Sequence, residues 1–424
     1  MLACFIPIFG DESYYYIWSL HPQLSYFDHP PMVSWFIYLS HLILPAGNPL
    51  SLRFLFILSS LVISVLWIKI LRLKNFSNPL IVMWLALLFL NPLLGPGSIL
   101  ATPDTPLVLF WSLSYFSYLK IISSKSLAWY SLLGVFLGLG FCSKYHIVLF
   151  VILGLIYLLI SKNIFSLRTK GVLLTLFFGV VFSLPVILWN AQNGWASFLF
   201  QIQHGFGESG FDWAWPLGYL LAQTLIINPF IFYTLFKKTL DYTDKVFSIS
   251  QLTFFFISSF KSIVEGNWPL TSHLHTATHF CSVAGQRLFR YAVSYWAVFY
   301  LSLGLFFFAP ITSDLSGAIK KNLVNASQLD ELLAVALEYQ PLYGPSYQLS
   351  SLLSWKLQKN VPKLAGLSRY DFYDSLPAST PNAAMFFVLK YDNSDWPPTY
   401  VRYNKIKLQS FDNLGLTLYQ FNYE

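Results

Sequence analysis

The sequence predicts an all-α polytopic membrane protein that ends in a small C-terminal α/β domain. The 424 residues are 55% hydrophobic, 19% aromatic and only 11% charged, whereas roughly 25% of the residues of a soluble globular protein are charged. The apolar residues come in blocks of about 17–22, which is the length of a helix that spans a bilayer. Beyond residue 310 the blocks stop and shorter, punctuated segments follow.

The positive charge of the chain does not indicate a nucleic-acid-binding protein. The formal net charge is +7, but the basic residues are spread through short loops instead of forming one patch. Cys4, Cys142 and Cys281 lie in or beside apolar runs, without metal-ligand spacing and with nothing that suggests disulfides. The opening MLACFIPIFG lacks the basic region and cleavage site of a signal peptide. It looks like the end of a further span whose start is missing.

Ten full spans are predicted after an aromatic outer loop. The loop, residues 11–51, holds two amphipathic stretches interrupted by His-Pro and Pro-Pro, which we interpret as helices lying in the membrane interface. The spans are predicted near residues 52–70, 79–95, 104–121, 127–143, 146–161, 171–189, 215–236, 247–263, 268–284 and 289–309.

The predicted span at residues 268–284 is the weakest, because it carries three histidines and few large apolar side chains. Without it, however, the following loop and the tail would change sides of the membrane. Neighbouring helices would then have to shelter its imidazoles. Since His275 and His279 are four residues apart, a metal site is an alternative to hydrogen-bonded interior histidines.

Basic residues predict which side of the membrane each loop faces. Thirteen of them lie in one set of loops, and only Arg53, Lys144 and Lys261 lie on the other side of the predicted membrane domain. By the positive-inside rule the first set faces the cytoplasm. The loop 11–51 and the tail are therefore predicted to be extracytoplasmic.

The tail, residues 310–424, is predicted to be a small α/β domain, separate from the membrane domain at residues 1–309. The segment SQLDELLAVALEY has helical periodicity. The segments AAMFFVLKY and LGLTLYQFNY are rich in aromatic and branched residues, which is typical of strands.

Five short polar motifs, GDES, FDHPP, ATPDTP, CSKYH and VEGNWP, are predicted on the same outer face. Asp28 and Asp104 stand at the edges of apolar runs, where an acid is costly and indicates function. Carboxylates beside Lys and His at headgroup depth suit transfer of a group that is carried on a phosphorylated lipid. A carboxylate can act as general base on an acceptor hydroxyl, and the cations can stabilise the departing phosphate.

In this order, DESYYYIWS, YFDHPPMVSW, ATPDTPLVLFW, GLGFCSKYH and VEGNWP resemble the bacterial branch of the dolichyl-phosphate-mannose protein mannosyltransferase family. Its relatives include the aminoarabinose transferases of lipid A, and the tail segments YGPSYQLSSLLSW and SRYDFYD also look like that branch. The resemblance implies a GT-C fold and an inverting glycosyltransferase of the cytoplasmic (inner) membrane. Its donor would be a polyprenyl-phosphate-linked sugar, and its acceptor a glycolipid, a lipid A-like molecule or a protein.

The resemblance also implies catalytic roles for three acidic residues. On the matching positions Asp11 is the catalytic base or its close partner, Glu12 supports it, and Asp104 is a polar-site aspartate at the start of a span. One departure concerns the substrate, because the lipid A aminoarabinose transferases have an arginine shortly after this acidic pair, where the present chain continues with SYY.

Donor-phosphate contacts are implied for His29 and Lys144. Asp28 and His29 stand where relatives have an acid and a cation before proline, and Asp28 can hold the His29 tautomer. Pro30 and Pro31 are predicted at the first turn of the second interfacial helix. The alternative is that this motif only shapes the helix start.

Further site candidates come from the same motifs: Tyr15, Tyr145, His146, Glu265 and Asn267. His146 and Glu265 have an alternative role in packing or helix capping. No metal ligand set is assigned and no cofactor is certain, although a divalent metal stays possible.

A transporter or flippase of lipid-linked sugars is the competing class. Ten or eleven spans and acids at membrane depth fit it, but transporters commonly bind near the midplane between repeated halves. Here the polar residues gather on one face and no internal repeat is visible, so glycosyl transfer is the favoured prediction.

Overall fold

The computed structural model describes residues 2–162, 167–206, 210–239, 242–308, 326–381 and 383–423. They form two compact units: Met1–Pro22, Ile37–Leu52 and Phe306–Glu424 in the first, and Gln23–Phe36 and Arg53–Leu305 in the second. The domain boundary predicted at residue 310 falls in 309–325, outside the described residues.

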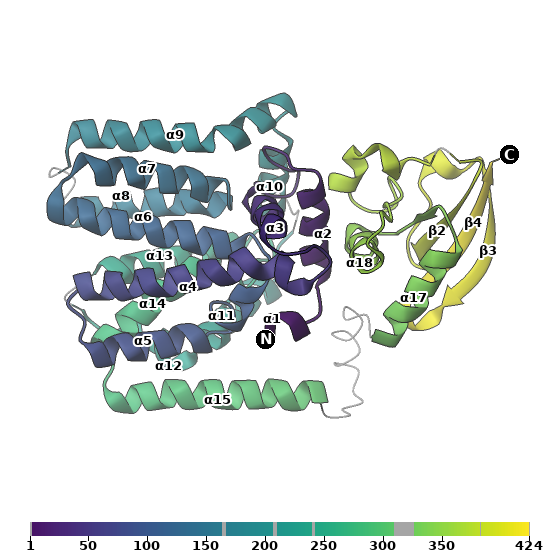
Figure 1. Cartoon of the computed structure of the whole chain (residues 1–424). Helices are drawn as coiled ribbons and strands as arrows, with labels where there is room; N and C mark the ends of the chain where they lie inside the picture. The colour runs from purple at the N-terminus through teal and green to yellow at the C-terminus, as the bar shows by residue number, and fades with distance from the viewer. Residues whose placement is uncertain are drawn as a thin grey trace. The chain divides into compact units, whose positions relative to one another are not determined.

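The second unit is built of helices, many of which run nearly parallel or antiparallel (Figure 1). They are α4 (Pro49–Leu73, which begins in the first unit), α5 (Asn78–Leu90), α6 (Asp104–Ser124), α7 (Leu127–Phe141), α8 (Val148–Ile160), α9 (Thr169–Gln192), α10 (Ala196–Phe206), α11 (Ala214–Ile227), α12 (Pro229–Thr234), α13 (Thr243–Ser258), α14 (Leu270–Val283) and α15 (Gln286–Phe308), with single 3₁₀ turns η1 (Pro96–Ile99) and η2 (Tyr145–Ile147). Each of the ten predicted spans contains a helix at its position. Among the described residues, α4, α6 and α9 are long and apolar enough to cross a membrane, so the count of ten spans stays a prediction.

The predicted span 215–236 is not one helix but two, α11 and α12, which are separated at Asn228. The backbone of Asn228 has φ 93°, a conformation that asparagine adopts more readily than most residues. Its Oδ1 accepts from the Phe230 amide at 3.0 Å, and its Nδ2 donates to the Ala292 carbonyl at 2.8 Å. Since Pro229 then opens a new helix, local chemistry breaks the apolar run.

Glycines bring α7 and α9 into backbone contact. A Cβ on Gly134 would lie 2.4 Å from the Thr175 carbonyl oxygen, and one on Gly138 would lie 2.8 Å from the Gly179 carbonyl oxygen. The two glycines are four residues apart and share one face of α7. This is the small-residue packing by which membrane helices approach closely, because lipid leaves no hydrophobic drive between them.

The weak segment 268–284 forms α14, whose residues from Leu270 to Cys281 are all buried. His275 Nδ1 lies 2.8 Å from Asp244 Oδ1, and Asp244 Oδ2 pairs with Lys74 Nζ at 2.7 Å. Trp111 Nε1 donates to His275 Nε2 at 2.9 Å. Because an indole N–H can only donate, His275 is a neutral tautomer that donates from Nδ1. Both of its nitrogens are used, so the interior-histidine prediction is confirmed and His275 has no nitrogen left for a metal.

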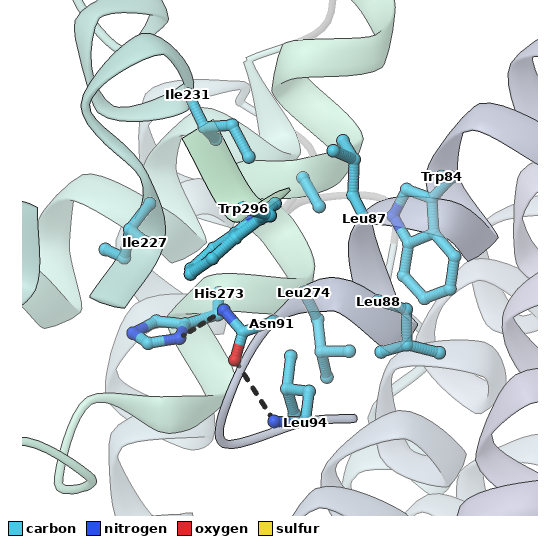
Figure 2. Close-up of a pocket in the computed structure, with 11 residues that line it drawn as sticks. Trp84, Leu87, Leu88, Asn91, Leu94, Ile227, Ile231, His273, Leu274 and Trp296 are labelled. Atoms are coloured by element: carbon cyan, nitrogen blue, oxygen red, sulfur yellow. Dashed lines mark hydrogen bonds between the residues drawn. The ribbon is translucent and has the colours of Figure 1, made fainter. Parts of the chain in front are cut away.

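His273, two residues before His275, is also held by polar side chains of neighbouring helices. Figure 2 shows its ring beside Asn91, whose Nδ2 lies 3.3 Å from Nδ1 of His273 and whose Oδ1 accepts from the Leu94 amide. His273 Nε2 meets Gln223 Oε1 at 3.2 Å. The cavity that Trp296 and the neighbouring side chains leave there is only about 10 Å³. Neighbouring helices thus supply the partners that lipid cannot offer to a helix this polar.

The first unit contains α1 (Leu2–Phe5), α2 (Gly10–Leu20) and a C-terminal domain. That domain has α17 (Ala326–Glu338), α18 (Tyr347–Leu357), four 3₁₀ turns, η4 (Phe372–Ser375), η5 (Pro377–Ser379), η6 (Pro398–Tyr400) and η7 (Asp412–Leu414), and strands β1 (Leu342–Tyr343), β2 (Met385–Tyr391), β3 (Tyr403–Phe411) and β4 (Leu416–Tyr423). The sheet order is β1-β2-β4-β3, with β1 parallel to β2 and the other pairs antiparallel. The predicted helix and both predicted strands are confirmed as α17, β2 and β4.

Alternation along β2 gives the sheet two apolar faces. Phe387 and Leu389 pack with Leu332 of α17 and Leu353 of α18. Phe386 and Val388 pack in a second cluster with Tyr400 and Phe421. Since successive strand residues point to opposite faces, this short β-strand contributes to two cores.

The helix α2 differs from the amphipathic interfacial helix that the sequence predicts. Its residues Glu12–Ser19 are all buried. It packs against α18, where a Cβ on Gly10 would meet Gln348 Cβ at 2.9 Å and where the Ser13 and Ser351 hydroxyls are 3.0 Å apart. Partners distant in sequence therefore cover a helix that its own pattern marks as half-exposed. The other helix of the predicted loop is α3 (Met32–Ile43).

Candidate active site

Asp104, Lys144 and Asn267 form the charged centre of the second unit. Lys144 Nζ lies 2.7 Å from Asp104 Oδ1, and Asn267 Nδ2 donates to Asp104 Oδ2 at 2.6 Å. The exposed fraction is 8% for Asp104 and 7% for Lys144. Since an unpaired buried charge is strongly destabilising, the carboxylate and the ammonium group hold each other in this position.

Local structure explains how the three side chains meet. Asp104 is the first residue of α6, where the helix dipole favours a negative charge. Lys144 lies in the turn between α7 and η2, and Asn267 lies in the turn just before α14. One helix start and two turns between helices thus contribute one residue each.

The motif FDHPP lies beside the Lys144 turn, because the Met32 amide donates to the Cys142 carbonyl at 2.9 Å. Asp28 is buried and its carbonyl accepts from Gln201 Nε2, while His29 is half-buried. The structure corrects the prediction for the prolines: α3 begins at Met32, so both precede its first turn. The carbonyl of the second proline accepts the first helical bond, from Trp35, so the motif does shape the helix start.

His146 packs close to the same centre. Its ring centroid is 5.2 Å from that of Phe255 and 5.7 Å from that of Trp268, and Lys144 and His29 both act on it electrostatically. In the described part of the chain its Nδ1 has no hydrogen-bond partner. His146 therefore lies within electrostatic range of the other two candidate cations, Lys144 and His29.

An apolar cavity of about 590 Å³ begins at the residues that follow Lys144. Tyr145 lines it and is fixed by a 2.8 Å hydrogen bond between its hydroxyl and that of Ser197. The other lining residues are Phe141, His146, Val148, Leu149, Ile152, Phe198, Gln201, Ile202, Phe254, Phe255, Ser258 and Trp268. The arrangement suits an apolar group that carries a polar head.

Asp11, Glu12 and Tyr15 lie in the first turns of α2 in the first unit. Glu12 is 1% exposed and its Oε2 accepts from the Phe9 amide at 3.3 Å, so it closes the start of the helix. Asp11 is exposed, and the Tyr347 hydroxyl donates to its Oδ1 at 3.5 Å. Tyr15 is buried and packs edge-on to Trp18. The two acidic residues thus differ in their surroundings: the Glu12 carboxylate accepts a backbone hydrogen bond, and Asp11 is exposed.

The structure therefore brings together FDHPP, ATPDTP, CSKYH and the GNWP part of VEGNWP in one unit, and places Asp11 and Glu12 in the other. Glu265 of VEGNWP is exposed, and its carbonyl accepts from the Trp268 amide. Sequence reasoning missed Gln201 and the Lys74–Asp244 pair. The signal for that pair was present, because both charges fall in loops assigned to the same membrane side.

Within the described ranges, no three His, Cys, Asp or Glu side chains are grouped so that they could hold a metal ion. In the charged centre an ammonium and an amide already contact the two oxygens of Asp104. A divalent metal there would compete with Lys144.

Comparisons with known proteins point in one direction. A family model described as dolichyl-phosphate-mannose-protein mannosyltransferase matches residues 28–189. The chain is 26% identical over 230 residues to the lipid A galacturonosyltransferase RgtD of Rhizobium johnstonii, which covers 54% of this chain and 48% of that protein. The chain thus spans about half the length of this curated relative.

The chain shares its fold with a protein of known structure. The crystal structure of ArnT from Cupriavidus metallidurans in the apo state matches 98% of this chain and 93% of that one, with a TM-score of 0.68 and 14% identity. The structure of the same protein bound to undecaprenyl phosphate gives a TM-score of 0.69 over 99% and 95% of the two chains, also at 14% identity.

Proposed function

We propose that this chain transfers a sugar from a lipid-linked donor, because it belongs to a bacterial GT-C, mannosyltransferase-like family of membrane glycosyltransferases. The donor is a polyprenyl-phosphate-linked sugar, and the reaction inverts the configuration at C1. The reaction is proposed to take place on the outer face of the cytoplasmic membrane, where the distribution of basic residues predicts the polar motifs to lie.

One observation carries this proposal: a buried charged centre lies next to a large apolar cavity. Lys144 and Asp104 form the centre at 2.7 Å, and the 590 Å³ cavity starts at Tyr145 and His146. A ligand that fits both parts has an anionic head and a hydrocarbon tail. A polyprenyl phosphate has this chemistry, and the solved relative named above binds undecaprenyl phosphate.

Lys144 and His29 are proposed to hold the donor phosphate. Asp104 neutralises Lys144 in the structure, so an arriving phosphate shares the ammonium with that carboxylate. His29 adds a second donor from the neighbouring motif, and the cations stabilise the charge that develops on the leaving phosphate.

Asp11 is proposed as the general base. An acceptor hydroxyl attacks C1 of the sugar, its proton passes to the Asp11 carboxylate, and the C1–O bond to the polyprenyl phosphate breaks. One displacement accounts for inversion, so no covalent intermediate is needed. Asp11 is exposed in the first turn of an aromatic helix, whereas Asp104, the alternative base, is buried in an ion pair with Lys144.

The acceptor is proposed to be a lipid A-like glycolipid. The curated relative is named as a lipid A galacturonosyltransferase, and the chain lacks the arginine that aminoarabinose transferases carry after the acidic pair. The proposal therefore specifies lipid A-like acceptors without specifying aminoarabinose as the sugar.

The test is sugar transfer by the purified chain in lipid nanodiscs, with polyprenyl-phosphate-linked sugars and lipid A as substrates. Mass spectrometry should detect a glycosylated acceptor and free polyprenyl phosphate. The Asp11→Asn variant keeps the size of the side chain and removes its basicity, so turnover should fall about 10²–10⁴-fold while donor binding survives.

Two outcomes count against the proposal. A near-normal rate in Asp11→Asn would remove Asp11 from the role of base and favour Asp104. In proteoliposomes, a donor that changes leaflets without losing its sugar would identify the chain as a transporter or flippase instead.

A further inference from the structure

The C-terminal domain contributes a side chain to the exposed carboxylate of α2. The hydroxyl of Tyr347, the first residue of α18, donates to Asp11 Oδ1 at 3.5 Å. The Tyr347 ring lies 4.3 Å from the ring of Tyr14, measured between centroids. The contact therefore fixes Tyr347 over the same helix turn that carries the acidic pair.

We propose that Tyr347 is a positioning residue for Asp11, so that the C-terminal domain takes part in the reaction. This inference rests on the proposed function, in which Asp11 accepts the proton of the acceptor hydroxyl. A carboxylate on an exposed helix turn can rotate about its side-chain bonds. A hydroxyl that holds Oδ1 directs Oδ2 toward the incoming acceptor, and such orientation lowers the barrier of a proton transfer.

Tyr347 is itself held by Arg369. The guanidinium carbon of Arg369 lies 4.9 Å from the centroid of the Tyr347 ring, a cation–π distance. Arg369 also donates from Nη1 to the Tyr370 carbonyl at 3.2 Å. The ring of Tyr347 thus has Tyr14 and Arg369 as neighbours, and little freedom remains for its hydroxyl.

The loop that follows Arg369 also holds α2. The Phe372 amide donates to the Tyr14 hydroxyl at 2.9 Å. Lys363, fully buried, reaches both Asp371 and Asp374 of this loop, the former at 2.7 Å. Because these bonds fix the loop, Tyr14 cannot slide along the domain without losing its hydrogen bond.

The contact between α18 and α2 leaves little room for adjustment. The Cβ that any residue other than glycine would add at position 10 meets Gln348. The Ser351 hydroxyl lies 3.0 Å from that of Ser13. The register of α18 on α2 is therefore set at the turn that carries Asp11, which is the precision that a positioning contact needs.

The experiment uses Tyr347→Phe in the full chain, which removes the hydroxyl and keeps the ring. A neutral hydrogen bond contributes about 0.5–1.5 kcal/mol, so kcat should fall about three- to tenfold while the KM for the donor stays unchanged. The matched control is Tyr419→Phe on β4, a partly buried residue far from α2 in the sequence, which should leave kcat unaltered.

A measurement independent of activity is carbodiimide labelling of carboxyl groups, read by mass spectrometry. Labelling of Asp11 should rise in Tyr347→Phe, while labelling of Asp412, exposed on the same domain, should not. Hydrogen exchange of α2 should stay at the wild-type level, which separates lost orientation from lost docking. Arg369→Met should reproduce both effects, and Arg369→Lys, which keeps a cation over the ring, should restore part of kcat.

Unchanged labelling of Asp11 together with a kcat within twofold of wild type would overturn the inference, even in an active enzyme. A wild-type chain that transfers no sugar contradicts the proposed function instead. In that case the labelling still decides whether Tyr347 orients the Asp11 carboxylate.

Discussion

Lys144 is already paired with the Asp104 carboxylate, and this ion pair affects how an anionic donor can bind. Its ammonium is 2.7 Å from Asp104 and only 7% of the residue is exposed. The site is therefore close to neutral without a ligand. An anionic donor must draw the lysine partly away from the carboxylate, and donor affinity should depend on both partners.

Replacing Lys144 by Ala should weaken donor binding about tenfold or more. A charge-assisted hydrogen bond contributes about 1.5–3 kcal/mol, and each 1.4 kcal/mol is a factor of about ten. Asp104→Asn should have the opposite effect on donor affinity, because it leaves the ammonium without a competing carboxylate. Binding of an inert donor analogue to the chain in nanodiscs measures both changes.

The matched control for Lys144 is Lys261→Ala, an exposed cation on the same predicted side of the membrane. It should leave donor affinity unaltered. The double variant Lys144→Ala/Asp104→Asn tests whether an unpaired carboxylate causes the loss. Unchanged donor binding with reduced turnover in Lys144→Ala would mean that Lys144 acts in a later step.

Asp371 should make the stability of the C-terminal domain depend on pH. Burial raises the pKa of Asp371 from 3.8 to about 6, against the effect of Lys363 and with that of the neighbouring Asp374. Between these two values the folded chain binds the proton more tightly than the unfolded chain. The contribution of Asp371 to the free energy of unfolding of the domain is therefore highest at about pH 4 and decreases as the pH rises through 6. This decrease is at most about 3 kcal/mol.

Hydrogen exchange of the β2 and β4 amides, corrected for the intrinsic effect of pH, measures this loss in the full chain. Asp371→Asn keeps the shape of the side chain and should flatten the profile between pH 4 and 6. Equal pH profiles for the two proteins would contradict the assignment.

Among the elements, α14 shows how a helix can be interior and polar. The cluster of Lys74, Asp244 and His275 is buried, and each member is paired. The Trp111 indole can only donate a hydrogen bond, so it fixes His275 in the tautomer that accepts at Nε2. The stability of this region should therefore depend on keeping the whole cluster balanced.

Lys74→Met should destabilise the protein by about 3–5 kcal/mol, because it leaves the Asp244 carboxylate buried without its cation. The double variant Lys74→Met/Asp244→Asn should recover most of this loss, since an amide oxygen can still accept from His275. Thermal unfolding of the chain in nanodiscs measures both. Lys69→Met, at an exposed position of α4 five residues before Lys74, should change little, and a double variant no better than the single would refute the charge argument.

Element positions could be predicted from the sequence because an apolar block is a local signal. The break at Asn228 was missed, since two helices and the residue between them are apolar enough to read as one span. Lys74 and Asp244, like Tyr347 and Asp11, are separated by well over a hundred residues, and no local pattern encodes such pairs. Motif residues were found by their chemistry, but the pairing of Lys144 with Asp104 needed the fold.

At the scale of the whole molecule, sidedness is the prediction with the widest consequence. The thirteen-to-three distribution of basic residues predicts that the C-terminal domain lies outside the cytoplasm. Alkaline phosphatase fused after Tyr423 should be active, because it folds only outside, and a green fluorescent protein fused there should be dark. A fluorescent fusion would reverse the assignment and move the site to the other face.

The polar character of α14 also constrains the order of biogenesis. A segment with so few apolar side chains does not partition from the translocon into lipid on its own. The hydrogen-bond partners of its three histidines precede it in the chain: Asn91 and Gln223 for His273, Trp111 and Asp244 for His275, and the Thr234 carbonyl for His279. The ribosome has therefore made these partners before it makes α14. The earlier helices can therefore bind α14 as it leaves the translocon, so that its polar side chains pass directly to protein partners without first being exposed to lipid.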